Sequence, residues 1–416
     1  MVPRDWTIGS LSDLADTVMG YAFKSTDFTP NGIPLLRMGN LYQNTLDFER
    51  SPVFLPATYK DEYKRFVVKP GDLVMSMTGT MGKRDYGFTV EIPKSAPESL
   101  LNQRVMKFVP KDKTSTGFLL SLLRSEIILS RLYSFPGGTK QANLSAKQVQ
   151  DLPAPIPPYP EQKKIAQILS AWDKAINTTE QLLTNSQQQK KALMQQLLTG
   201  KKRLLDKNGV RFSGEWKDHF LTDAAQVIVS PVDKKTIDGE IPVELCNYTD
   251  VYYNHHITRG LNFMKATAKP AEIEKYTLQI NDVIITKDSE TPGDIAVPAL
   301  VSEDLGGVVC GYHLAIVRPK TETAKGAFLN YLFSLPKTRY YFFTLATGAT
   351  RFGLSIGGIN KVHFRIPPLE EQQKIADVIS IADQKITSLQ QKLDRLKQEK
   401  KALMQQLLTG KRRVIN

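Results

Sequence analysis

The chain contains one twelve-residue segment twice, and this repeat limits its fold more than any other feature. The segment KKALMQQLLTGK occupies positions 190–201 and returns unchanged at 400–411, 210 residues later. The same offset relates further pairs: Pro157-Pro158 and Pro367-Pro368, EQKKIA at 161–166 and EQQKIA at 371–376, Trp6 and Trp216, Leu11 and Leu221. Two copies of one module predict an internal pseudo-twofold, which suits an approximately twofold partner such as the backbone of B-DNA.

The charge of the chain favours a polyanionic partner. Lys and Arg number 55 against 42 Asp and Glu, which gives a net charge of +13 and a pI near 9.4. A cationic surface gains binding free energy by releasing counterions from phosphates. An ordinary solvated basic surface would show the same balance, and no basic tail concentrates the charge.

Other features of the composition exclude several classes of protein. The mean hydropathy is −0.28, no run of about 18 apolar residues occurs, and the first residues lack the apolar core of a signal peptide. We therefore expect a cytoplasmic protein. The two cysteines, Cys246 and Cys310, have no CxxC partner, which argues against a disulfide scaffold and a zinc ribbon alike.

Each copy contains a long stretch with a heptad pattern of apolar residues. The first covers about 162–198, lacks proline and meets glycine only at Gly200; the second repeats this pattern up to Gly410. A narrow apolar seam with a period of seven predicts a coiled-coil helix, about 55 Å long. Because the polar seam residues Thr179 and Ser186 would weaken a dimer of the first helix with itself, we expect this helix to pair with the more apolar second helix as an intramolecular antiparallel coiled coil.

The predicted seam has fifteen members: Ile165, Leu169, Trp172, Ile176, Leu183, Leu193, Leu197, Ile375, Ile379, Ile386, Leu389, Leu393, Leu396, Leu403 and Leu407. The alternative is an ordinary amphipathic helix packed on a globular core.

The rest of each copy predicts a globular region with mixed strands and helices. Apolar runs at 72–76 and 282–286 follow turn residues and indicate strands, and helical stretches follow near 117–132 and 326–343. We expect α/β (α+β) domains at 1–155 and 211–365, with long helices at 156–210 and 366–416. Because the helices repeat closely and the globular regions diverge, the pattern indicates a common frame that carries two different readers.

Motifs for catalysis are missing from the chain. An amino-methyltransferase loop needs Asp, Asn or Ser before Pro-Pro, but Ile156 and Ile366 stand there, and their side chains cannot accept a hydrogen bond. We expect these prolines to stiffen the helix entries, with Glu161 and Glu371 in the favourable first turn. The segment GTMGK at 79–83 has two residues between its glycines where a P-loop needs four. The five histidines show no metal-ligand spacing, so we expect no enzyme activity of the chain by itself.

The doubled order of motifs resembles the specificity (S) subunits of type I restriction–modification systems. In the first copy the resemblance rests on Gly137-Gly138-Thr139, Leu144-Ser145 and the hinge PPYPEQKKI at 157–165; in the second, on Thr347-Gly348-Ala349, Leu354-Ser355 and PPLEEQQKI at 367–375. Each copy also ends in Leu-Leu-Thr-Gly-Lys. The resemblance covers the whole chain.

This resemblance implies a DNA-binding function and a set of partners. The globular regions would be target recognition domains that each read one half of a split, asymmetric DNA sequence, and the helices would be the spacer. Two modification (M) subunits, which carry S-adenosylmethionine and methylate adenines, would bind the spacer. Restriction (R) subunits, with ATP and Mg, would complete the endonuclease. Two domains reading successive major-groove faces would sit about 34 Å apart, a distance that the spacer can hold.

Base reading requires Arg, Lys, Asn or Gln at groove edges, supported by aromatic or hydroxyl groups. The candidates on predicted loops are Arg37, Asn40, Lys83, Arg84, Lys140, Gln141, Asn143, Asn247, Tyr248, Tyr252, Lys287 and Arg351. For any single one of these, a solvated surface position is the alternative.

Two other classes of function compete with this interpretation. One is an S-like half of a single-chain restriction–methylation enzyme, which needs a fused methyltransferase domain for which 416 residues filled by two repeats leave no room. The other is a duplicated coiled-coil scaffold that does not bind DNA. A failure to bind any duplex even with M subunits present would favour the scaffold.

Overall fold

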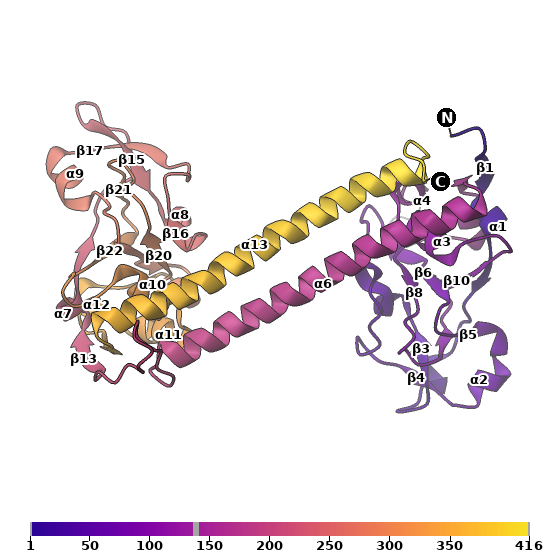
Figure 1. Cartoon of the computed structure of the whole chain (residues 1–416), viewed down its shortest axis with the longest axis horizontal. Coiled ribbons are helices and arrows are strands. Elements are labelled where there is room, and N and C mark those ends of the chain that lie inside the picture. The colour runs from indigo at the N-terminus through magenta and orange to yellow at the C-terminus, as the bar shows by residue number, and fades with distance from the viewer. Residues whose placement is uncertain (1, 136–140, 415–416) are drawn as a thin grey trace. The chain divides into compact units, whose positions relative to one another are not determined.

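The computed structural model describes residues 2–135 and 141–414, and the chain divides into two compact units. The first consists of Met1–Gln181 with Gln391–Asn416, and the second of Leu182–Gln390. Two long helices, α6 (Tyr159–Leu197) and α13 (Leu369–Leu408), each give one half to each unit. Each unit therefore holds one globular region and two half-helices (Figure 1).

The globular region of the first unit is built on two small sheets. The first sheet has the order β2 (Ala15–Met19), β10 (Val105–Pro110), β6 (Leu73–Ser76), β8 (Thr89–Glu91). The second has the order β4 (Phe54–Leu55), β3 (Ile33–Leu36), β9 (Ser99–Leu101), β5 (Val67–Val68). Two ribbons complete it: β1 (Thr7–Ser10) with β12 (Pro153–Ile156), and β7 (Thr78–Thr80) with β11 (Gln141–Asn143).

Short helices connect these strands. They are α1 (Leu11–Leu14), α2 (Tyr59–Glu62), α3 (Thr116–Leu123), α4 (Glu126–Leu132) and α5 (Ala146–Gln150), with 3-10 turns η1 (Ser25–Asp27), η2 (Met38–Asn44) and η3 (Lys64–Phe66). The apolar face of α3, with Phe118, Leu119 and Leu122 fully buried, packs in the main core of this unit.

The second unit has the same plan. Its larger sheet has the order β14 (Ala225–Val229), β22 (Leu314–Pro319), β18 (Val283–Thr286), β20 (Pro298–Val301), β16 (His256–Ile257), and its smaller sheet β17 (Met264–Ala268), β15 (Ile241–Cys246), β21 (Val309–Cys310). The ribbons are β13 (Lys217–Phe220) with β24 (His363–Ile366), and β19 (Asp288–Ser289) with β23 (Phe352–Gly353). The short helices are α7 (Leu221–Ala224), α8 (Tyr248–Tyr252), α9 (Pro270–Tyr276), α10 (Gly326–Ser334), α11 (Pro336–Thr344), α12 (Ile356–Asn360) and η4 (Pro292–Asp294).

The two units share their elements at the offset of the sequence repeat. Strand β2 begins at Ala15 and β14 at Ala225, and helix α6 begins at Tyr159 and α13 at Leu369. The strand order β2-β10-β6-β8 matches β14-β22-β18-β20. The predicted mixed helix–sheet domains are confirmed, as are the strands at 72–76 and 282–286, which are β6 and β18. The sheets differ in two ways: the larger sheet of the second unit gains a fifth strand, β16, and its smaller sheet has three strands where the first unit has four.

The half-helices within each unit run antiparallel. In the first unit, residues later in α6 pair with residues earlier in α13, as expected for helices that run in opposite directions. The ion pairs between the helices are Lys400–Asp173 at 2.5 Å and Lys397–Glu180 at 2.7 Å in the first unit, and Lys190–Asp383 at 2.5 Å in the second.

All fifteen predicted seam residues are buried or half-buried in the structure, but they do not all pack helix against helix. Ile165, Leu169 and Leu407 belong to the core of the first unit, and Leu197 and Ile375 to a core of the second. The amphipathic alternative therefore describes the helix ends, which dock on the globular regions. The polar seam positions Thr179 and Ser186 are also buried, at 3% and 6% exposure.

The Pro-Pro-x-x-Glu-Gln hinge fixes the start of each long helix. Gln162 Oε1 accepts from the backbone N–H of Ser115 at 3.0 Å, and its Nε2 donates to the Pro157 carbonyl at 3.0 Å. Gln372 makes the equivalent pair of bonds in the second unit. One amide thus ties the helix entry to the start of α3 or α10.

The hinge glutamates do more than complement the helix dipole. Glu161 accepts from Trp6 Nε1 at 2.9 Å and from Arg413 Nε at 2.8 Å. Glu371 is fully buried and accepts hydrogen bonds from Nε and Nη2 of Arg203, both at 2.6 Å. Each glutamate therefore holds the segment that follows the end of the other long helix in its own unit.

Candidate nucleic-acid interface

A two-stranded ribbon in the first unit presents the predicted residues Gln141 and Asn143. Strand β11 pairs with β7 so that Gln141 lies opposite Thr80 and Asn143 opposite Thr78. Because side chains alternate along a strand, Gln141 and Asn143 share one face, and both are exposed, whereas Ala142 between them is buried. The register therefore gives two amide side chains on one open surface.

The turn that follows β7 brings basic residues next to these amides. Lys83 donates its backbone N–H to the Thr80 carbonyl at 3.0 Å, and its side chain is exposed. The Thr80 N–H donates to Asp85 Oδ1 at 2.8 Å, which fixes the turn. Arg84 is exposed as well, but it pairs with Glu126 at 2.9 Å. The predicted residue Lys140 lies outside the described residues.

The two remaining predicted residues of the first domain, Arg37 and Asn40, differ in their exposure. Arg37 is exposed at the start of η2. Asn40 is only 3% exposed: its Oδ1 accepts from the Arg37 N–H at 2.9 Å, and its Nδ2 donates to the carbonyls of Asp47 and Arg50. The prediction that Asn40 contacts DNA is therefore wrong, because its amide is buried and used by the fold.

The second unit carries the equivalent ribbon. Asp288 of β19 lies opposite Gly353 of β23, and both positions stand 210 residues after the Thr78–Asn143 pair of the first ribbon. The predicted residues Lys287 and Arg351 flank the two strands. The same backbone frame thus presents amides in the first copy and cations in the second.

A chain of polar contacts joins Lys287 to Arg351. Lys287 Nζ lies 2.7 Å from Asp288 Oδ2, which lies 3.1 Å from His313 Nδ1. Arg351 Nη2 lies 3.2 Å from both ring nitrogens of His313. Because Arg351 Nη2 is equally far from Nδ1 and Nε2, this contact does not single out one acceptor nitrogen of His313. The chain orders Arg351, which is exposed, before any ligand arrives.

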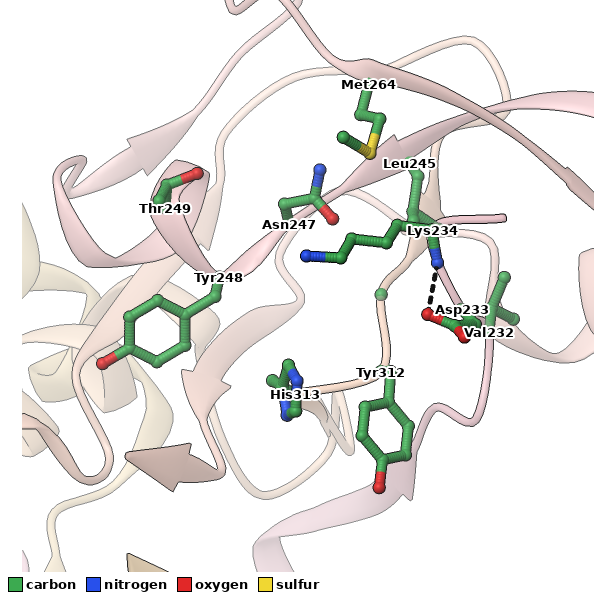
Figure 2. Close-up of a pocket in the computed structure, with 11 residues that line it drawn as sticks. Val232, Asp233, Lys234, Leu245, Asn247, Tyr248, Thr249, Met264, Tyr312 and His313 are labelled. Carbon is green, nitrogen blue, oxygen red and sulfur yellow. Dashed lines mark hydrogen bonds between the residues drawn. The ribbon is translucent and has the colours of Figure 1, made fainter. Parts of the chain in front are cut away.

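A hollow of about 210 Å³ adjoins this chain and shares His313 with it. In Figure 2 Lys234 and Asn247 lie on one side of it, and Tyr312 and His313 on the other. Asn247 was predicted as a contact residue, whereas Lys234, Tyr312 and His313 were not. Lys234 and its neighbour Asp233 are both exposed and both line the hollow, so the rim carries a positive and a negative charge.

The two predicted tyrosines lie against each other. The Tyr248 and Tyr252 rings stack with their centroids 5.6 Å apart, and Tyr248 lines the hollow. The Tyr252 hydroxyl donates to Asp294 Oδ1 at 3.1 Å. Tyr252 therefore holds the Tyr248 ring in place by stacking, and its own hydroxyl is hydrogen-bonded within the protein.

Sequence reasoning missed His313 and Asp288 because their signal is tertiary. His313 lies 38 residues before Arg351, on the turn before β22. Only the structure relates this position to the first unit: the Lys287 N–H donates to the His313 carbonyl at 2.9 Å, and the Met77 N–H donates to the Arg104 carbonyl at 2.9 Å. Exposed Arg104 is thus the first-copy equivalent of His313.

A family model describes both copies. The model for the type I restriction modification DNA specificity domain matches residues 3–185 and again 214–398. The chain belongs to this family. Both copies of this domain lie in one chain, as expected for a non-catalytic specificity subunit of a type I restriction–modification system.

Individual specificity subunits show the same relationship. The type I restriction enzyme EcoBI specificity subunit of Escherichia coli is 24% identical over 398 residues, which cover 89% of this chain and 77% of that protein. The MjaVIII specificity subunit of Methanocaldococcus jannaschii is 31% identical over 210 residues, which cover 50% of this chain and only 48% of that relative. The crystal structure of an S subunit from M. genitalium shares the fold, with a TM-score of 0.58, 14% identity and coverage of 98% and 96%.

The structure also bears on the motifs that sequence reasoning set aside. Residues 79–83 lie in strand β7 and the turn after it rather than at the start of a helix, as a P-loop would. The Pro157-Pro158 step joins β12 to α6. Cys246 and Cys310 are free and buried. Among the described residues no three His, Cys, Asp or Glu side chains gather to hold a metal ion, and none of the described helices has the length and apolarity to span a membrane.

Proposed function

We propose that each ribbon reads one half of a bipartite DNA target from the major groove. The observation that carries this proposal is the recurrence of one ribbon at the same register in both copies, with different polar residues on it. The major groove admits a two-stranded β-ribbon. Since the frame is common and the side chains differ, the two half-sites differ in sequence.

The side chains on the two ribbons suit different bases. Gln141 and Asn143 have the amide geometry that pairs with adenine, and Arg351 has the fork that pairs with guanine O6 and N7. Basic side chains near the ribbons attract the neighbouring DNA phosphates, and these are Lys83, Arg84, Lys234 and Lys287. Arg37, Asn247 and Tyr248 extend the proposed surface beyond the ribbons.

The division of labour along the chain follows from this proposal. Residues 1–155 and 211–365 are the two recognition domains, and 156–210 and 366–416 carry the spacer helices. The spacer binds two M subunits, which hold S-adenosylmethionine, and R subunits with ATP and Mg join them. The complex works in the cytoplasm. The family supports this division of labour, and the interhelix ion pairs support the pairing of the two helices as a spacer.

Two single variants test the ribbons. The chain is purified in complex with its M subunits, and methylation of a randomised duplex library is sequenced for wild type, Gln141→Ala, Arg351→Ala and the control Lys392→Ala, an exposed residue of α13. A bidentate contact is worth about 1–3 kcal/mol, so each ribbon variant should relax discrimination at one base pair by about 5- to 150-fold.

The two variants should affect opposite half-sites, and the control should leave both unchanged. An unaltered target in both ribbon variants, with methylation retained, would mean that the ribbons do not contact the bases.

A further inference from the structure

A hollow of about 330 Å³ lies inside the first unit, where α3 meets α6 and α13. Its charged lining consists of Arg124, Asp173, Lys397, Lys400 and Lys401. The remaining lining residues are neutral: Asn44, Leu120, Ser121, Ile176 and Met404. Four cationic side chains thus surround a space with a single carboxylate in its wall.

Two of these cations have no carboxylate partner. Lys400 pairs with Asp173 and Lys397 with Glu180. Arg124 is half-buried, and its Nε and Nη2 donate to the carbonyls of Thr89 and Asn44 at 2.8 and 3.2 Å.

Desolvation lowers the pKa of the Arg124 guanidinium. Exposed Lys401 makes no ion pair within the part of the chain that the structure describes. Attraction to the carboxylates of Asp173 and Glu91 offsets the desolvation of Arg124 only in part, and an anion in the hollow would relieve the remaining cost.

The second unit keeps the repeated helix but carries different residues at the positions that line this hollow. Its helix segment at 190–201 is identical to 400–411. At the 210-residue offset, however, Tyr331 stands for Ser121, Ser334 for Arg124 and Gln187 for Lys397. The Tyr331 hydroxyl donates to Asp383 Oδ2 at 3.0 Å. The Tyr331 hydroxyl thus contacts Asp383, the counterpart of Asp173. The counterparts of Arg124 and Lys397 are uncharged, so the second unit has two fewer positive charges at these positions.

We propose that the hollow of the first unit binds a phosphate group, held by Arg124 and Lys401 above the space that Ser121 leaves open. A phosphate offers several acceptor oxygens in different directions, which suits one guanidinium and one ammonium that approach from different helices. The group could be supplied by free phosphate or by the backbone of DNA, and both present the same oxyanion chemistry.

Calorimetric titration of the full chain with inorganic phosphate, in chloride at matched ionic strength, tests the site. Lys401→Gln removes one ligand, and Lys191→Gln makes the same change at the same position of the identical segment in the second unit. Ser121→Tyr fills the hollow with the residue that the second unit already accommodates. Thermal melts of each variant check that it is folded.

Wild type and Lys191→Gln should bind phosphate alike. Lys401→Gln should weaken binding about tenfold or more, since a hydrogen bond to a charged group contributes about 1.5–3 kcal/mol, and Ser121→Tyr should abolish it. Absence of binding by wild type, equal losses in the two lysine variants, or full binding by folded Ser121→Tyr would each overturn the proposal.

Duplex binding at several salt concentrations then identifies the source of the phosphate. If a DNA phosphate occupies the site, Lys401→Gln should reduce the slope of log affinity against log salt by about 0.9 relative to Lys191→Gln, and free phosphate should compete with duplex. Equal slopes would overturn DNA as the source and leave the calorimetric result as support for a free phosphate.

Discussion

The buried ion pair between Arg203 and Glu371 gives the most specific stability prediction. The Glu371 side chain is 0% exposed and that of Arg203 is 21% exposed, and the guanidinium reaches both carboxylate oxygens at 2.6 Å. Arg203→Met leaves a buried carboxylate without its cation. Removing one partner of a buried pair costs about 3–5 kcal/mol, and we expect about 3 because Arg203 keeps some contact with water. For a unit of this size the melting temperature should fall by about 6–12 °C.

Differential scanning calorimetry of the full chain measures this loss, and two further variants sharpen it. Arg413→Met makes the equivalent change in the first unit and should cost less, because Glu161 keeps its bond from Trp6, whereas the equivalent Trp216 Nε1 has no partner. The double variant Arg203→Met/Glu371→Leu should recover most of the lost stability, since an apolar pair replaces a buried ion pair at little cost. A loss below about 1 kcal/mol in Arg203→Met, as for a solvated surface pair, would refute this reasoning.

Three more predictions follow from individual contacts. Burial alone would raise the pKa of Glu161, but the bonds from Arg413 and Trp6 outweigh it and hold the pKa below its ordinary value of 4.5. The stability that Glu161 contributes should therefore be fully present above pH 4.5 and be lost as the pH falls through the folded pKa. Acid unfolding of Trp6→Phe should begin at a higher pH than that of wild type. Thr179 is buried and its hydroxyl donates back to the Ala175 carbonyl at 2.8 Å, so Thr179→Val should raise stability by about 0.5–1 kcal/mol in chemical denaturation, and a loss would show that the hydroxyl stabilises the helix. Inserting four residues after Ser186 adds about 6 Å of helix and should lengthen the gap in the methylated target by one or two base pairs with unchanged half-sites; an active variant with an unchanged gap would place the control of spacing in the M subunits.

The repeat made much of the fold predictable from sequence. An offset that holds from Trp6 to the last Gly-Lys step requires the same elements twice, and both long helices begin 210 residues apart. The glycine caps are also local: Gly200 and Gly410 have φ values of +71° and +72°, a conformation that glycine adopts readily because it has no Cβ. Local pattern and backbone chemistry determine features of this kind.

The candidate site was predictable only where side-chain exposure follows from local pattern. Gln141 and Asn143 flank a buried alanine on a strand, so their shared exposed face was within reach of the sequence. Asn40 was predicted as an exposed loop amide, but its side chain is hydrogen-bonded to three backbone groups of its own turn. The His313–Asp288 contact and the Arg124 hollow join segments that are distant in sequence, and no local pattern encodes them.

If two independent recognition domains share one helical frame, exchanging one of them should change one half-site only. Residues 216–360 are replaced by the matching region of another specificity subunit, the chain is expressed with its M subunits, and methylated adenines are mapped across the host genome. One half of the bipartite target should change while the other half stays the same. Simultaneous change of both halves in an active complex would contradict independent reading by the two ribbons.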